Sequence, residues 1–206
     1  MLIEIIDIGV GNVHSIENLI HKLNIPTKII STPQEIKSDF LILPGVGSAK
    51  LYMHKLQNSG FDKAIKKHLK ENKKLLGICL GFQVLGKYSD EDGGVQGLGV
   101  IDGYTKRLDN NLSNNTWQEF NLKKENLLIE NFIPNLKLTK KQGIRGRVFY
   151  NHEYGFICKD TNCFTKPISI NLNKYSSIVI KGNIIGMQFH PEKSQQTGID
   201  LMSLIL

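Results

Sequence analysis

A single cysteine between two glycines is the residue of this sequence best placed to do chemistry. Residues 77–81 read Gly-Ile-Cys-Leu-Gly, a G-x-C-x-G pattern that is the cysteine counterpart of the G-x-S-x-G turn. In such a turn a strand bends so sharply into a helix that the flanking residues must be small, and the nucleophile is lifted out of the sheet. The helix N-terminus would favour the thiolate of Cys79, and the N–H of Leu80 would face an oxyanion. The alternative is a buried, unreactive thiol, because cysteine is among the most buried residue types.

A base for Cys79 lies much later in the chain, in the stretch MQFHPEKS of residues 187–194. His190 ends an apolar run and Glu192 follows two positions on, so the two side chains face the same side of an extended chain. A carboxylate bonded to one ring nitrogen would orient the imidazole and leave the other nitrogen for the sulfur. A strand-end histidine beside a surface glutamate is the alternative interpretation.

The elements that must position these residues alternate between strands and helices in the first half of the chain. Hydrophobic runs predict strands and apolar residues at helical spacing predict helices. The strands are expected at 2–8, 27–30, 39–45 and 74–78, and the helices at 13–24 and 61–72. This alternation predicts an α/β fold with a mostly parallel central sheet, helices on both faces, and functional loops at the C-terminal ends of the strands.

The second half of the chain has a different pattern. Between about 95 and 180, short extended stretches broken by Gly and Asn predict extra antiparallel strands added to the parallel core. Residues 109–146 are rich in Asn and Lys and allow no assignment. With 206 residues and 40% hydrophobic content, the chain is expected to form a single domain over 1–206.

Charge and composition argue against nucleic-acid and membrane partners. The net charge is +7, but the lysines are scattered over helical faces without interleaved aromatics, which favours a solvated surface over a nucleic-acid site. No apolar run approaches the roughly 18 residues of a membrane span, and Glu4 and Asp7 interrupt the first one. We therefore expect a cytoplasmic protein without a nucleic-acid or membrane partner.

The remaining cysteines and histidines predict no metal site. Three cysteines are too few for a disulfide framework, and Cys158 and Cys163 lack a second pair of ligands at zinc-binding spacing. His21 and His68 lie on polar faces of the expected helices, so we expect both to be exposed.

Three motifs in order resemble those of the class I (triad) glutamine amidotransferases over nearly the whole chain. They are LPGVGSA at 43–49, GICLGFQVL at 77–85 and GMQFHPEKS at 186–194. Further stretches are similar, within that family, to the glutaminase subunits of imidazole glycerol phosphate synthases: DIGVGNVHSI, GLGVIDG and QFHPEKSQQTG. The resemblance implies hydrolysis of L-glutamine to glutamate and ammonia without a cofactor. The ammonia would pass to a cyclase subunit with a (β/α)₈ barrel, in a heterodimer of histidine biosynthesis.

The resemblance also assigns roles at the site. Cys79 would attack the side-chain amide of glutamine, His190 would protonate the departing ammonia, and Glu192 would orient His190. Gln83 and Glu91 match substrate-binding positions of the family. The oxyanion donors would come from Gly45, Val46, Gly47 and Leu80.

The same resemblance places four residues near the partner interface, namely Asn12, Trp117, His152 and Lys193. A helix cap for Asn12 and a solvated charge for Lys193 are the alternatives. The chain departs from the family in two stretches, NNTWQEF and NHEY, where Asn151 and Glu153 are unexpected. These departures leave open a related subunit that supplies ammonia to a synthase modifying surface sugars. A noncatalytic regulatory subunit is the alternative from another class.

Overall fold

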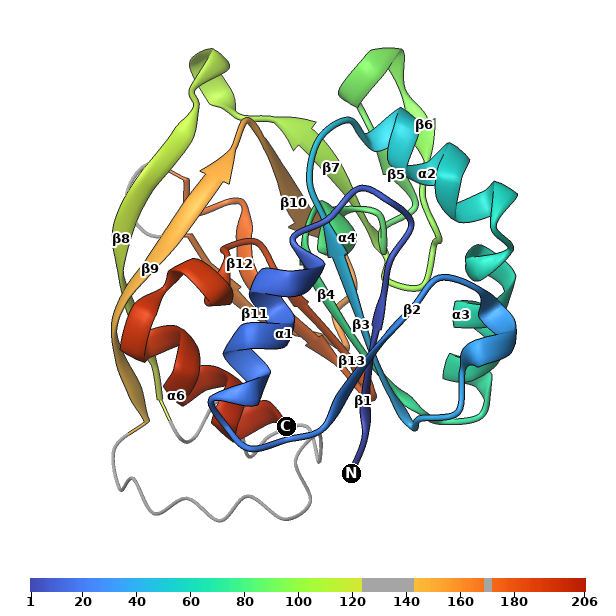
Figure 1. Ribbon diagram of the computed structural model, residues 1–206. Coiled ribbons are helices and arrows are strands. Elements are labelled where there is room, and N and C mark those ends of the chain that lie inside the picture. The colour runs from blue at the N-terminus through green and yellow to red at the C-terminus, as the bar shows by residue number, and fades with distance from the viewer. Residues whose placement is uncertain (124–142, 169–171) are drawn as a thin grey trace.

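A mostly parallel sheet forms the centre of the fold (Figure 1), in a computed structural model that describes residues 1–123, 143–168 and 172–206. The strand order is β11-β12-β13-β4-β3-β1-β2, and the neighbours from β13 to β2 are parallel. At the other edge, β12 pairs antiparallel with both β11 and β13. The strands are β1 (Ile3–Ile6), β2 (Thr27–Ile30), β3 (Phe40–Gly45), β4 (Lys74–Cys79), β11 (Phe164–Pro167), β12 (Ser176–Lys181) and β13 (Ile184–Met187).

The central strands bury both of their faces, as their continuous hydrophobic runs predict. Along β3, Phe40 and Ile42 belong to one hydrophobic core, whereas Leu41 and Leu43 belong to a second core on the opposite face. Successive side chains of a strand point to opposite sides, so one strand supplies both cores. This two-sided burial fixes the register of β3 against β4, where Gly45 lies opposite Cys79.

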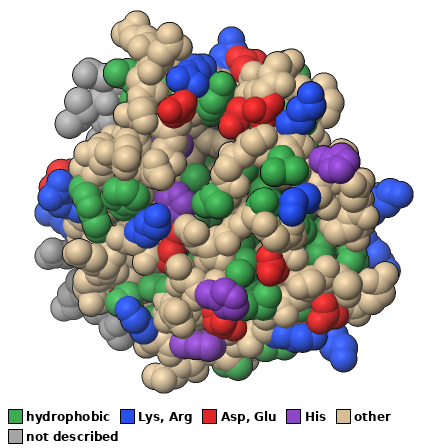
Figure 2. Space-filling view, turned by 45° about the horizontal axis from the view of Figure 1, so that its top comes forward, with side chains coloured by type: hydrophobic (Ala, Val, Ile, Leu, Met, Phe, Trp, Pro, Cys, Tyr) green, Lys and Arg blue, Asp and Glu red, His purple; other side chains and the backbone are tan. Residues whose placement is uncertain are grey.

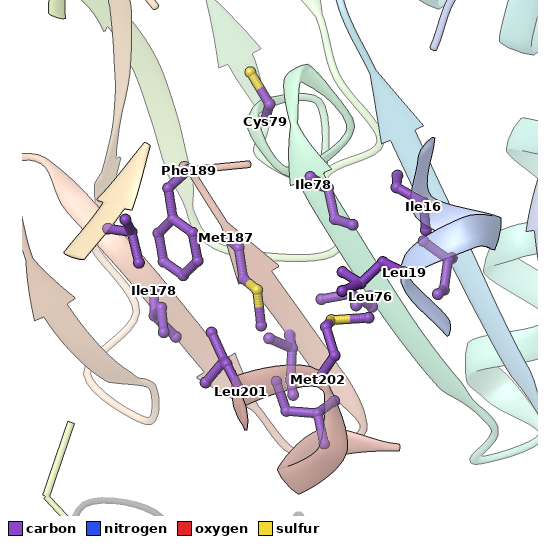
Figure 3. Close-up of a cluster of buried hydrophobic side chains, with 14 of the residues drawn as sticks. Ile16, Leu19, Leu76, Ile78, Cys79, Ile178, Met187, Phe189, Leu201 and Met202 are labelled. Carbon is purple, nitrogen blue, oxygen red and sulfur yellow. The ribbon is translucent and has the colours of Figure 1, made fainter. Parts of the chain in front are cut away.

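Helices cover both faces of the sheet (Figure 1), with α1 and α6 on one side and α2 and α3 on the other. On the first side, Ile16 and Leu19 of α1 and Met202 of α6 pack with Leu76 of β4 (Figure 3). The helices are α1 (Val13–His21), α2 (Ala49–Asn58), α3 (Phe61–Lys70), α4 (Leu80–Gln83) and α6 (Gln195–Ile205). Short 3₁₀ turns occupy η1 (Pro33–Glu35), η2 (Glu91–Gly93), η3 (Asp109–Asn111) and η4 (Pro191–Lys193).

The extra strands of the second half form a smaller sheet and a two-stranded ribbon. The smaller sheet has the order β10-β7-β5-β6, with antiparallel pairing of β10 to β7 and of β5 to β6. The ribbon pairs β8 with β9 antiparallel. These strands are β5 (Tyr88–Ser89), β6 (Val95–Gln96), β7 (Gly103–Arg107), β8 (Asn114–Leu122), β9 (Ile144–His152) and β10 (Tyr154–Cys158). The prediction of added antiparallel strands is therefore confirmed.

The ribbon accounts for part of the stretch that the sequence left unassigned. Both β8 and the start of β9 fall within 109–146, and residues 124–142 of that stretch lie outside the described residues. No helix in the described part of the chain is long and apolar enough to cross a membrane.

One histidine prediction is correct and the other is wrong. His21 is exposed, but His68 has only 3% of its surface accessible. The end of α3 folds over the start of β4, and the Nε2 atom of His68 lies 3.0 Å from the carbonyl oxygen of Lys74. Burial lowers the pKa of His68, so the neutral ring is favoured in this apolar position.

Candidate active site

Cys79 lies at a strained turn between β4 and α4. Its backbone has φ 55° and ψ −113°, a conformation that residues other than glycine rarely adopt. A Cβ atom on Gly81 would overlap the carbonyl oxygen of Leu43, and one on Gly77 would lie 2.8 Å from the carbonyl oxygen of Gly81. The two glycines of the motif therefore allow the strand to turn this close to β3. Figure 3 shows the sulfur of Cys79 directed away from the buried apolar side chains below it.

His190 and Glu192 meet Cys79 at this turn. Nδ1 of His190 lies 2.8 Å from Oε1 of Glu192, and the same imidazole hydrogen-bonds the side chain of Cys79. Because the carboxylate accepts from Nδ1, the Nε2 atom is left for the sulfur. Asn12, at the start of α1, donates from Nδ2 to the same carboxylate oxygen at 3.1 Å. The order of the groups is thus amide, carboxylate, imidazole and sulfur.

The electrostatics favour an ionised histidine–glutamate pair. Burial lowers the pKa of His190, but hydrogen bonds to Cys79 and Glu192 outweigh it and raise that pKa to about 10. Burial raises the pKa of Glu192, but the bond to His190 outweighs it and the net shift is downward. An imidazolium held between a carboxylate and a sulfur can donate a proton to a leaving group on the sulfur side.

The segment after β3 lies directly beside this turn. An added Cβ on Gly45 would be 2.6 Å from the backbone nitrogen of Gly81, so only glycine allows this approach. The segment is tied at both ends. At one end the hydroxyl of Tyr52 donates to the carbonyl oxygen of Pro44. At the other, Oδ2 of Asp92 accepts from the hydroxyl of Ser48 at 2.6 Å and from the N–H of Lys50 at 3.0 Å.

A cavity of about 310 Å³ opens over Cys79. Its size falls at the lower end of small-molecule sites. The lining residues come from six regions of the chain: Asn12, Val46, Gly47, Cys79, Leu80, Gln83, Glu91, Asn151, His152, Glu153, Tyr154, His190 and Lys193. Figure 2 shows the molecule turned so that this end of the sheet comes forward, with a hollow near the centre and acidic and basic side chains around it.

Gln83 and Glu91, predicted as substrate-binding residues, both line the cavity. Nε2 of Gln83 donates to the carbonyl oxygen of Tyr154 at 2.7 Å. Burial, followed by repulsion from Asp92, raises the pKa of Glu91 to about 7, although a bond from the N–H of Ala49 opposes the shift. Glu91 is therefore a carboxyl that titrates near neutral pH at the cavity wall.

The four residues predicted near a partner interface fall in different places. Lys193 is exposed, with its ammonium 5.6 Å from the centroid of the Phe149 ring. The Trp117 ring lies against the same ring, with centroids 5.6 Å apart and the planes tilted by 58°. Asn12 faces inward to Glu192. His152 lines the cavity, but its side chain is buried with 7% exposure and is hydrogen-bonded within the chain.

Both ring nitrogens of His152 are hydrogen-bonded inside the chain. Nδ1 lies 2.8 Å from the carbonyl oxygen of Tyr154, and Nε2 lies 2.8 Å from Nδ2 of Asn114. Burial lowers the pKa of His152 to about 4, so the ring is neutral. The ring can therefore donate once and accept once, and both bonds are made inside the protein.

Three features of the site were absent from the sequence prediction. Asn151 and Glu153 line the cavity, although they entered only as departures from a family pattern. Gln188 lies against both Cys79 and Gln83. The sequence could have indicated Gln188, because it is two positions before His190 and residues two apart in an extended chain face the same side. Among the described residues, no group of three His, Cys, Asp or Glu side chains could hold a metal ion.

Comparison with known proteins identifies the family of this arrangement. The family described as glutamine amidotransferase class-I matches residues 4–202. Imidazole glycerol phosphate synthase subunit HisH of Prochlorococcus marinus is 37% identical, over 98% of this chain and 92% of the relative. HisH 2 of Methanococcus maripaludis is 38% identical, over 98% and 96% of the two chains.

A longer relative and a solved structure agree with this assignment. The chloroplastic imidazole glycerol phosphate synthase hisHF of Arabidopsis thaliana is 32% identical over 100% of this chain, which covers 34% of that protein. The structure of PurLQS from Thermotoga maritima has a TM-score of 0.73 at 17% identity, covering 99% of this chain and 96% of the other, and confirms the predicted fold class. This chain belongs to the class I glutamine amidotransferases, within the family of imidazole glycerol phosphate synthase HisH subunits.

Proposed function

We propose that this chain is the glutaminase subunit of an imidazole glycerol phosphate synthase in histidine biosynthesis. It releases ammonia from L-glutamine and passes it to a cyclase subunit with a (β/α)₈ barrel, with which it forms a heterodimer. The observation that carries the proposal is the hydrogen-bonded set of Cys79, His190 and Glu192 at the cavity, in a chain 37% identical to a HisH subunit. The match to about a third of a longer hisHF protein supports a second component.

The geometry supports a two-step acyl transfer. The proton of Cys79 is already held by the His190 imidazolium, so the sulfur attacks the amide carbon of glutamine as a thiolate. The oxyanion is stabilised by the N–H of Leu80 and by a peptide of 45–47. His190 then protonates the departing nitrogen, so ammonia leaves and a thioester forms. Water, deprotonated by His190, attacks the thioester, and glutamate leaves as the Cys79 thiolate and the His190 imidazolium are restored.

The cavity wall supplies groups for the amino-acid end of the substrate. Glu91 provides a carboxylate for the ammonium group, and Gln83 provides a carbonyl oxygen because its Nε2 is bonded inside the protein. Residues 1–206 act as one unit in this proposal, since the site takes residues from both ends of the chain, Asn12 and Lys193 among them.

The affinity for glutamine is expected to fall as the pH drops below 7. The raised pKa of Glu91, about 7, means that the carboxylate needed by the substrate ammonium is lost below that pH. KM should therefore rise by up to about tenfold per pH unit below 7, with a smaller change above it. Steady-state kinetics between pH 5.5 and 8.5 (roughly the range in which such a carboxyl titrates) would measure this dependence.

A pair of variants isolates the contribution of Glu91. Glu91→Gln should have a high KM at every pH, because its side chain carries no charge to titrate. Glu71→Gln, at the end of α3 and outside the cavity, should keep the wild-type profile. A KM of Glu91→Gln that still rises steeply below pH 7 would assign the titration to a group other than Glu91.

The alternatives raised by the sequence have little support. The unexpected Asn151 and Glu153 lie in the cavity wall, beside the substrate-binding residues. The compared relatives are named as imidazole glycerol phosphate synthase subunits, which favours histidine biosynthesis over the modification of surface sugars. A regulatory subunit without activity would not need Cys79, His190 and Glu192 in hydrogen-bonding contact.

The proposal is tested by measuring glutamate release from glutamine by the purified chain, with and without the cyclase subunit of the same organism and its ribonucleotide substrate. We expect strong stimulation by the cyclase and its substrate. If stimulation is absent while a reactive glutamine analogue still labels Cys79, the chain is a glutaminase of a different synthase. If the analogue does not label Cys79 and no glutamate is released, the glutaminase assignment itself is wrong.

A further inference from the structure

Gln188 lies between two residues of the proposed glutaminase site and takes part in none of the steps above. It follows β13, two positions before His190, and its side chain is completely buried. Its Oε1 accepts a hydrogen bond from Nε2 of Gln83 at 3.1 Å, and its Nε2 donates to the sulfur of Cys79 at 3.9 Å. Gln188 thus connects the nucleophile with a wall of the substrate cavity.

The bonding partners determine which end of the Gln188 amide faces the sulfur. The side chain of Gln83 also contacts the backbone carbonyl oxygen of Tyr154, at 2.7 Å. A carbonyl oxygen only accepts, so the atom of Gln83 that faces it must be the nitrogen. That same nitrogen faces Gln188, so Gln188 must present its oxygen there and its N–H₂ group to Cys79.

The chain of amides also fixes what Gln83 offers to a ligand. Both hydrogens of its Nε2 are used, one by Tyr154 and one by Gln188. The remaining polar atom of this cavity-lining side chain is its carbonyl oxygen, which accepts from an N–H group of the substrate. The orientation of Gln83 therefore depends on the oxygen of Gln188.

We propose that Gln188 is a positioning residue with two separate effects on the glutaminase reaction. Through its N–H it holds the sulfur of Cys79 in the attacking position and stabilises the thiolate opposite His190. Through its oxygen it holds Gln83 with the carbonyl oxygen toward the substrate. The inference rests on the proposed function, because it assigns a role in a reaction at Cys79.

Two substitutions separate these effects. Gln188→Glu keeps an oxygen for Gln83 but removes the N–H that faces the sulfur. Gln188→Met keeps a side chain of similar length and removes both polar groups. We expect Gln188→Glu to lose about 10- to 100-fold in kcat with KM within about threefold of wild type, and Gln188→Met to lose kcat and raise KM together. Turnover is measured in the complex with the cyclase subunit and its ribonucleotide.

A second measurement tests the effect of Gln188 on the sulfur of Cys79 independently of glutamine binding. Alkylation of Cys79 by iodoacetamide is followed by mass spectrometry against pH in the full-length chain. The titratable groups that interact with the sulfur are His190 and Tyr52, and Glu192 lies behind His190. None of them is changed by the substitutions, but Gln188→Glu adds a carboxyl beside the sulfur. Gln188→Met adds no charge and is therefore the variant that reports the loss of the N–H; it should shift the alkylation curve to higher pH, by about one pH unit. A residue that only fills space would not shift it.

The outcomes distinguish this inference from the proposed function. Gln96→Glu, on exposed β6, is the matched control and should retain wild-type turnover and alkylation. If wild type is active but both Gln188 variants keep its kcat and its alkylation curve, the inference is wrong and the proposed function stands. If Gln188→Glu does not fold, as judged by circular dichroism, Gln188→Met alone decides. If the wild-type protein is inactive and its Cys79 is not alkylated, the proposed function itself is wrong, whatever the Gln188 variants show.

Discussion

Replacing Cys79 with serine is expected to lower glutamate release by at least about 10⁴-fold. A hydroxyl is a much weaker nucleophile than a thiol at neutral pH, and the imidazole of His190 is arranged to exchange a proton with sulfur. The fold should be unaffected, because the substitution keeps the size of a side chain that points into the cavity. Glutamate release in the presence of the cyclase subunit and its ribonucleotide measures the loss.

Two controls separate the loss of the nucleophile from damage to the complex. Cys158→Ser changes a thiol at the end of β10, away from the cavity, and should retain wild-type turnover. An ammonium salt should restore product formation by the cyclase in the presence of the Cys79→Ser chain, because that step needs only ammonia. Glutamate release above about 1% of wild type in Cys79→Ser would contradict the nucleophile assignment.

Replacing Gly81 with alanine is expected to destabilise the protein by roughly 3 kcal/mol or more. The added methyl group would overlap the carbonyl oxygen of Leu43 and lie 2.8 Å from its carbonyl carbon, in the middle of the central sheet. Neither β3 nor the turn can move away without breaking the pairing of Gly45 with Cys79. Urea unfolding monitored by circular dichroism would measure the change in the free energy of unfolding.

Gly11→Ala provides the matched glycine control for this measurement. The nearest atoms to its added methyl group would lie at 3.4 Å, on Pro44, which is ordinary contact. We expect a cost below about 1 kcal/mol there. A Gly81→Ala chain as stable as Gly11→Ala would mean that the turn can separate from β3, and the argument from close packing would be wrong.

Local patterns in the sequence predicted the parts of the site that depend on one turn or one strand. The G-x-C-x-G motif predicted the turn at Cys79, and the spacing of His190 and Glu192 predicted their hydrogen bond. Both depend only on backbone geometry over a few residues. Hydrophobic runs predicted β2 and most of β3 and β4 for the same reason.

The parts that could not be predicted depend on contacts between distant segments. His68 shares the buried face of α3 with Phe61 and Ile65, so helical spacing contained its burial, but not the contact of its ring with the carbonyl oxygen of Lys74 at the start of β4. His152 belongs to a strand whose bonding partner, Asn114, lies in the other strand of the ribbon. Gln188 acquires its role only because Cys79 lies beside it in the folded protein. Periodicity describes the faces of one element and contains no information on which other element covers them.

The short segment between β3 and α2 is anchored at both ends, and its peptide planes can rotate between the two anchors. Tyr52 fixes it at Pro44, and Asp92 fixes it at Ser48, so residues 45–47 form a bridge held at both ends. Gly47 already has φ 91°, a region open to glycine at little cost. A crankshaft rotation of the peptide planes inside this bridge can reverse the direction of an N–H group while both anchors stay in place. The N–H groups that the proposed mechanism assigns to the oxyanion can therefore be turned without moving either α2 or the sulfur of Cys79.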